Sequence, residues 1–133
     1  METHLINDLK QKFIVTRQHS EEIAKPLSEA DAQLQSMPDV SPSKWHLAHT
    51  TWFFETFILK KFQDQYRPYD ELYNFLFNSY YNGIGEQYPR HQRGLISRPS
   101  LQEVVSYRHH VDEAMIIYIG DCKEPSILSL IHI

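Results

Sequence analysis

Apolar residues recur every three to four positions in three stretches of the chain, a spacing typical of amphipathic helices. In the first stretch, residues 5–24, Leu5, Leu9 and Phe13 are four residues apart, with Ile6 and Ile23 in support. Lys25-Pro26 should end this helix because a residue before proline is pushed out of the helical region. The pattern therefore predicts a first helix over residues 5–24.

A second helix is predicted from Ser41 to about Lys61. Ser41 suits the N-cap and Pro42 the first helical position, and residues 37–42 are a loop by their prolines and small polar residues. One side of this helix carries Trp45, His49, Trp52, Thr56 and Leu59. Further aromatic residues lie beside that stripe, so we expect a deeply buried helix.

A third helix should run from the capping-box pair Ser100 and Glu103 to Gly120, a suitable C-cap. Its expected core side is Leu101, Val104, Val111, Met115 and Tyr118. Residues 62–98 form a long aromatic stretch with no regular pattern, and residues 127–133 look like two turns of a further helix. The prediction is an all-α fold of three helices plus the start of a fourth, in one domain over residues 1–133.

Composition narrows the class of protein. The chain has 133 residues, of which 41% are hydrophobic and 23% charged, as in ordinary globular domains. Its formal net charge of −4 argues against a nucleic-acid binder, and no apolar run reaches the roughly 20 residues of a membrane-spanning helix. A single cysteine, Cys122, excludes an internal disulfide and fits a reducing compartment, so we expect a cytoplasmic protein.

Two histidine pairs have different prospects as metal ligands. His46 and His49 are three residues apart and project from one helix face, so both could bind a metal. The alternative is that one faces the core with a local hydrogen bond and the other is partly solvated. Glu55 is rotated about 120° from His49 and should not share its site. The adjacent His109 and His110 diverge and fit a solvated edge.

A cationic segment and an aromatic cluster are two further candidates. Arg90, Arg93 and Arg98 could clamp an anionic small molecule, because guanidinium groups bind carboxylates and phosphates through paired hydrogen bonds. The alternative is ordinary surface charge, or pairing with nearby acidic residues (Asp70, Glu71 and Glu86). The aromatic cluster could form a cage for a cation, although such clusters are more often core. The tyrosines with the best claim to exposure are Tyr80, Tyr81 and Tyr88.

Several motifs resemble one known family. Residues 34–55, which include Ala48-His49-Thr50-Thr51-Trp52, are similar to the N-terminal DinB-like domain of ergothioneine-biosynthesis sulfoxide synthases. Residues 77–81, 93–99 and 107–112 resemble the same family, in the same order. The resemblance covers the chain from about residue 10 to its end.

The resemblance implies a DinB-like four-helix bundle that precedes a C-terminal domain related to formylglycine-generating enzymes. Together the two domains hold a non-haem Fe(II) on three histidines. The reaction joins the sulfur of gamma-glutamylcysteine, or of cysteine in some members, to hercynine with dioxygen, and the product is a sulfoxide. By motif, His49 matches the first iron ligand and His46 a position that is not a ligand. Arg90 and Arg93 look like the substrate-binding pair that grips the thiol's carboxylates.

The sequence departs from the family at its end. The other two iron ligands lie in an H-x-x-x-H-x-E segment that would follow a stretch like residues 128–133, and the chain stops at Ile133. We therefore expect a truncated domain that is inactive alone and holds no iron stably, because one imidazole binds Fe(II) weakly. We also expect a homodimer through the open seam of the bundle, with Leu128 and Ile131 at the contact.

Two other functions stay open at this point. One is a stand-alone DinB-like thiol transferase that uses a divalent metal, and the other is a non-enzymatic helical binding domain. The related ovothiol pathway, whose enzymes use a similar bundle, is a further alternative to ergothioneine biosynthesis. The identity of the thiol is open as well.

Overall fold

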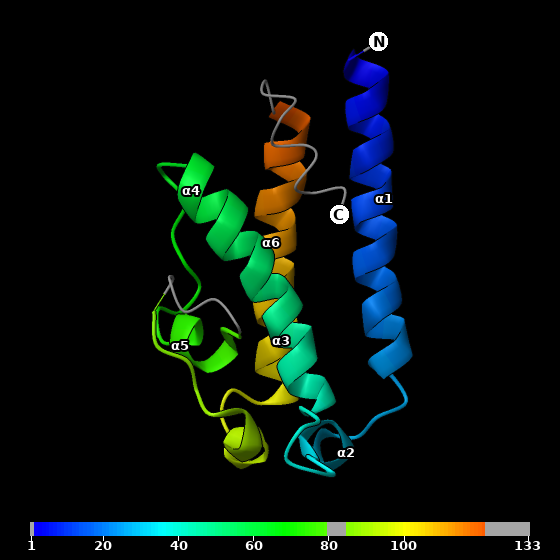
Figure 1. Cartoon of the computed structure of the whole chain (residues 1–133). Coiled ribbons are helices and arrows are strands. Elements are labelled where there is room, and N and C mark those ends of the chain that lie inside the picture. Colours follow the sequence, from blue (N-terminus) through cyan, green and yellow to red (C-terminus); the bar gives the residue numbers. More distant parts are fainter. Residues whose placement is uncertain (1, 80–84, 122–133) are drawn as a thin grey trace.

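The protein is built from helices. The computed structural model describes residues 2–79 and 85–121, and no β-strand forms within these ranges (Figure 1). The elements are α1 (Glu2–Ala24), α2 (Glu29–Gln33), α3 (Ser43–Phe54), the π-helix η1 (Glu55–Leu59), α4 (Lys60–Phe62), α5 (Tyr73–Phe77), the 3₁₀-helix η3 (Arg90–Leu95) and α6 (Leu101–Asp121). The predicted all-α class is confirmed.

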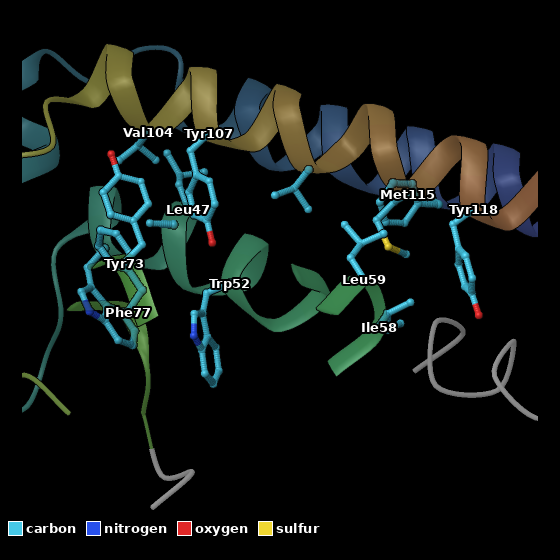
Figure 2. Close-up of a cluster of buried hydrophobic side chains, with 14 of the residues drawn as sticks. Leu47, Trp52, Ile58, Leu59, Tyr73, Phe77, Val104, Tyr107, Met115 and Tyr118 are labelled. Atoms are coloured by element: carbon cyan, nitrogen blue, oxygen red, sulfur yellow. The ribbon is translucent and has the colours of Figure 1, made fainter. Parts of the chain in front are cut away.

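Three long helical segments pack side by side. Helix α6 contacts both α1 and the continuous α3–η1–α4 segment, and α3 runs in the same direction as α6 while α1 runs in the opposite direction (Figure 1). Their inward faces form one core, part of which is shown in Figure 2. Its fully buried large side chains include Trp52, Phe77, Tyr107 and Met115. Burial of this apolar face, rather than helix propensity, supplies most of the stability of such helices.

The predicted core side of the first helix is only partly right. Leu9 and Phe13 are buried, but Leu5 and Ile23 are 59% and 67% exposed. A spacing of four residues turns 400°, so the stripe drifts by about 40° at each step. Leu5 and Ile23 are each rotated about 80° from Phe13 and leave the core, and the next buried position after Phe13 is Arg17.

The second helix begins one residue later than predicted. Pro42 is the N-cap and Ser43 the first helical residue, so Ser41 does not cap the helix. The Ser41 hydroxyl accepts a hydrogen bond from the Arg93 side chain instead, at 2.9 Å. The segment then continues through the π turn to Phe62, close to the predicted end.

The third helix has the predicted core side and begins directly after Ser100 as predicted, but its end differs. Gly120 lies inside α6 and is not its C-cap. Only half of the expected capping box forms, because the backbone N–H of Glu103 donates to the Ser100 hydroxyl at 3.1 Å while the Glu103 carboxylate pairs with Arg98 at 2.8 Å. The backbone N–H of Leu101 is bound by a carboxylate of α2, that of Glu29.

The stretch expected to be irregular contains two short helices, α5 and η3. They are too short to leave a periodic signal in the sequence, and they carry much of the site described below. The expected fourth helix, with Leu128 and Ile131, lies outside the described residues, as does Cys122. In the part of the chain that the structure describes, no helix has the length and apolar character needed to cross a membrane.

Candidate functional site

A pocket of about 360 Å³ lies beside the first turns of α3. It is walled by the loop before α3, by the chain after α5 and by η3; the lining residues are Asp39, Val40, Ser41, Trp45, His46, His49, Ser79, Arg90 and Arg93. The three residues that the family resemblance assigned to the metal and the substrate, His49, Arg90 and Arg93, therefore line one pocket, together with His46. Arg98 does not line it, because its guanidinium is exposed and pairs with Glu103.

The His49 imidazole is held in one tautomer. Its Nδ1 lies 2.6 Å from the backbone carbonyl of Phe77, at the end of α5. A carbonyl oxygen can only accept, so Nδ1 carries the proton and the lone pair is on Nε2. This is the state of a histidine that binds a metal through Nε2, with the carbonyl fixing the orientation of the ring.

The surroundings of His49 favour the neutral imidazole. Burial lowers its pKa, the hydrogen bond to the Phe77 carbonyl raises it, and the positive charge of Arg93 and the neighbouring His46 lower it again, with a net fall from 6.5. Burial and then Arg93 also lower the pKa of His46. Both imidazoles are therefore available as uncharged ligands near neutral pH.

The titration of His49 gives a first prediction. Its ring resonances in NMR spectra should titrate with a midpoint below 6.5, the ordinary value. Because the unfolded state then binds more protons than the folded state, the contribution of His49 to the free energy of unfolding should be fully present above pH 6.5. It should be lost as the pH falls below this value. Arg93→Ala removes a positive charge and should raise the midpoint. A midpoint above 6.5 in the unaltered chain would contradict this assignment.

Aromatic rings enclose His49 on both faces. The Trp45 ring is stacked against it at 4.6 Å between centroids and the Trp52 ring at 5.5 Å, with interplanar angles of 10° and 16°. The two tryptophans lie four residues before and three residues after His49, so they approach it from successive turns of α3. The imidazole can therefore rotate little, which keeps Nε2 in one direction.

Helix α5 supplies a hydrogen-bond acceptor to every ring of this stack. The Trp45 Nε1–H donates to the carbonyl of Leu76 at 2.9 Å, and the Trp52 Nε1–H to the Asn74 side-chain oxygen at 2.8 Å. Phe77 completes the set through its contact with His49. These three acceptors could not be identified from the sequence, because two of them are backbone carbonyls and any residue type provides one.

Arg93 is a buried residue rather than a surface charge. Only 3% of it is exposed, and its guanidinium lies 3.7 Å from the centre of the Trp45 ring. One Nη donates to Ser41 at 2.9 Å and the other to the Asn78 carbonyl at 3.5 Å. Burial first, and the charge of Arg90 second, lower the pKa of Arg93 to about 10, so it stays charged at neutral pH.

The η3 turn that carries both arginines is anchored by two glutamines missed in the sequence. Gln35 donates from Nε2 to the Arg90 carbonyl and accepts from the Gly94 N–H, both at 2.7 Å, and Gln33 donates to the Gly94 carbonyl at 2.7 Å. A Cβ on Gly94 would lie 2.8 Å from the Cβ of Gln35. Glycine is thus required for this close approach. Gly94 was the feature of the sequence that could have indicated the contact with Gln35.

The remaining candidates lie away from the pocket. Glu55 is buried and accepts hydrogen bonds from Tyr66 and Tyr107, in agreement with its expected separation from His49. His109 and His110 are exposed, as the solvated-edge interpretation requires. For the aromatic cage, Tyr88 packs against the core, and Tyr80 and Tyr81 lie outside the described residues.

Comparison with known proteins is consistent with this architecture. The family model of the DinB superfamily matches residues 12–125. No curated protein matches the sequence at a significant level. Because the family match covers most of the chain, including the whole pocket, the protein belongs to the DinB superfamily.

Proposed function

We propose that this chain is the DinB-like domain of a non-haem iron sulfoxide synthase, which joins the sulfur of gamma-glutamylcysteine to hercynine in ergothioneine biosynthesis. The observation that carries the proposal is the convergence of His49, Arg90 and Arg93 on one pocket. These are the residues that the motif resemblance assigns to the metal and to the carboxylates of the thiol. The family match supports the DinB-like part of the proposal.

The chemistry of His49 fits a metal ligand. His49 lines the pocket, and its Nδ1 is hydrogen-bonded to a carbonyl, as is usual for histidines that bind a metal through Nε2. Within residues 2–79 and 85–121 no group of three His, Cys, Asp or Glu side chains could hold a metal ion. The motif resemblance assigns one ligand among these residues, His49. A bound iron with open coordination positions would supply the dioxygen chemistry.

The two arginines fit the binding of a carboxylated substrate. Arg93 is fixed at the pocket wall by Ser41 and Trp45, so it adds charge without loss of side-chain entropy on binding. Arg90 is less buried and lines the same pocket. Guanidinium groups pair with carboxylates in a fixed planar geometry, which would orient the thiol relative to His49.

Metal binding tests the role of His49. Anaerobic titration with Fe(II), followed by calorimetry, should show weak binding, because a single assigned imidazole holds the ion loosely. His49→Ala should abolish this binding, whereas His46→Ala, which alters the neighbouring imidazole of the same pocket, should leave most of it. Tight binding that survives in His49→Ala would contradict the assignment.

Substrate binding tests the arginines separately. Gamma-glutamylcysteine should bind at least tenfold more weakly to Arg90→Ala, since a charge-assisted hydrogen bond contributes roughly 1.5–3 kcal/mol. The matched control is Arg98→Ala, which removes an exposed guanidinium that does not line the pocket. Equal losses in Arg90→Ala and Arg98→Ala would indicate general charge attraction rather than a pocket contact.

A further inference from the structure

We propose that Trp45 is a positioning residue that fixes the Arg93 guanidinium and the His49 imidazole relative to each other across its indole ring. This inference rests on the proposed function, because it concerns how the anion-binding and metal-binding groups of that pocket are kept in register. Trp45 itself is 4% exposed and lies at the pocket wall.

The two groups occupy opposite faces of the indole. The Arg93 guanidinium carbon is 3.7 Å from the ring centre, and the His49 ring is stacked at 4.6 Å with an interplanar angle of 10°. Atoms in contact are about 3.5–4 Å apart, so two flat groups this close to one ring would overlap if they shared a face. The order through the stack is therefore Arg93, Trp45, His49.

Each member of the stack is also held from outside it. The Trp45 Nε1–H donates to the Leu76 carbonyl, Arg93 donates to Ser41, and His49 contacts the Phe77 carbonyl. Neither outer group can approach the other without displacing the indole. The thickness of one aromatic ring thus sets their separation, and a ligand that contacts both groups meets a preformed spacing.

The test compares Trp45→Leu, which removes the ring, with Trp45→Phe, which keeps a flat ring. Two probes are titrated separately by NMR: succinate for the anion-binding group and Co(II) alone for the imidazole. Trp45→Leu should raise the dissociation constants of succinate and Co(II) at least tenfold, whereas Trp45→Phe should change each by less than threefold. Trp52→Phe, which alters a ring that contacts His49 from the other side, should affect Co(II) alone.

A ligand-free measurement accompanies the titrations. The Arg93 Hε resonance should be shifted upfield by the Trp45 ring in the unaltered chain and in Trp45→Phe, and should return to its ordinary position in Trp45→Leu. If Trp45→Leu does not fold, Arg93→Lys replaces it, because lysine keeps the charge but cannot lie flat on the indole. Co(II) affinity should then fall although residue 93 is not a ligand.

Three outcomes would overturn the proposal: both dissociation constants within twofold of the unaltered chain in Trp45→Leu, loss of one probe only, or unchanged Co(II) affinity in Arg93→Lys. Failure of the unaltered chain to bind either probe would instead refute the proposed function. The Arg93 resonance would then decide alone whether Trp45 fixes the guanidinium, and an unshifted resonance would refute that as well.

Discussion

Replacing Arg108 with alanine is expected to lower the free energy of unfolding by about 3–5 kcal/mol, the usual cost of removing one partner from a buried ionic network. Arg108 lies on α6 and is fully buried. Its guanidinium donates to the Leu47 carbonyl of α3 at 2.9 Å and to the Arg17 carbonyl of α1 at 3.0 Å. It also contacts the Glu21 carboxylate of α1 at 3.3 Å. One side chain therefore ties together all three long helical segments.

A second buried arginine, Arg17, extends this network. Arg17 pairs with Asp112 of α6 at 2.7 Å and donates to the Thr51 hydroxyl of α3. Burial first, and the charge of Arg17 second, lower the pKa of Arg108 to about 10, while Asp112 and Glu21 oppose this fall, so Arg108 stays charged at neutral pH. Without Arg108, two buried carbonyls lose a donor and a cavity forms between the helices.

Urea unfolding followed by circular dichroism measures this loss. Lys12→Ala is the control, because it removes a cation from an exposed i,i+4 pair with Asp8 and should change stability by no more than about 0.5 kcal/mol. Arg108→Lys keeps the charge but cannot reach all three helices, and it should give an intermediate loss. A change below about 1 kcal/mol in Arg108→Ala would show that the network adds little to stability.

The helical pattern predicted the long elements because burial follows the sequence period closely in α6. Val104, Val111 and Met115 are all fully buried, as their spacing predicted. The same spacing places residue 108 on the core side, but an arginine is ordinarily interpreted as a surface residue. Its burial depends on carbonyl and carboxylate partners from α1 and α3, and a pattern within one helix contains no information about these.

The candidate site could likewise be predicted only in part. The residue types of His49, Arg90 and Arg93 made them candidates, the family resemblance distinguished them from the other candidates, and the structure brings them to one pocket. What the sequence could not provide is the part built from the backbone, such as the Phe77 carbonyl that sets the tautomer of His49. The conformation of the stretch between α4 and α5 could not be predicted from the sequence either, because it depends on a buried carboxylate.

That carboxylate belongs to Glu55, and its replacement by alanine should cost about 3 kcal/mol, because each buried donor left unpaired costs roughly 1–3 kcal/mol. Glu55 lies in η1 and is 1% exposed. It accepts hydrogen bonds from the Tyr66 hydroxyl at 2.5 Å, the Tyr107 hydroxyl at 3.1 Å and the backbone N–H of Tyr69 at 3.3 Å. Burial and the adjacent carboxylate raise the pKa of both phenols, so they stay protonated as donors.

The loss at Glu55 should extend to the pocket, because the bond to the Tyr69 N–H fixes the chain that leads into α5. Hydrogen exchange measured by mass spectrometry should therefore accelerate over residues 66–77 in Glu55→Ala, and the His49 ring should lose part of its fixed orientation. Tyr107→Phe, which removes one donor and leaves the carboxylate in place, is the control and should cost about 1 kcal/mol without faster exchange in α5. Faster exchange confined to α6, with α5 unchanged, would show that Glu55 stabilises the core but does not hold the wall of the pocket.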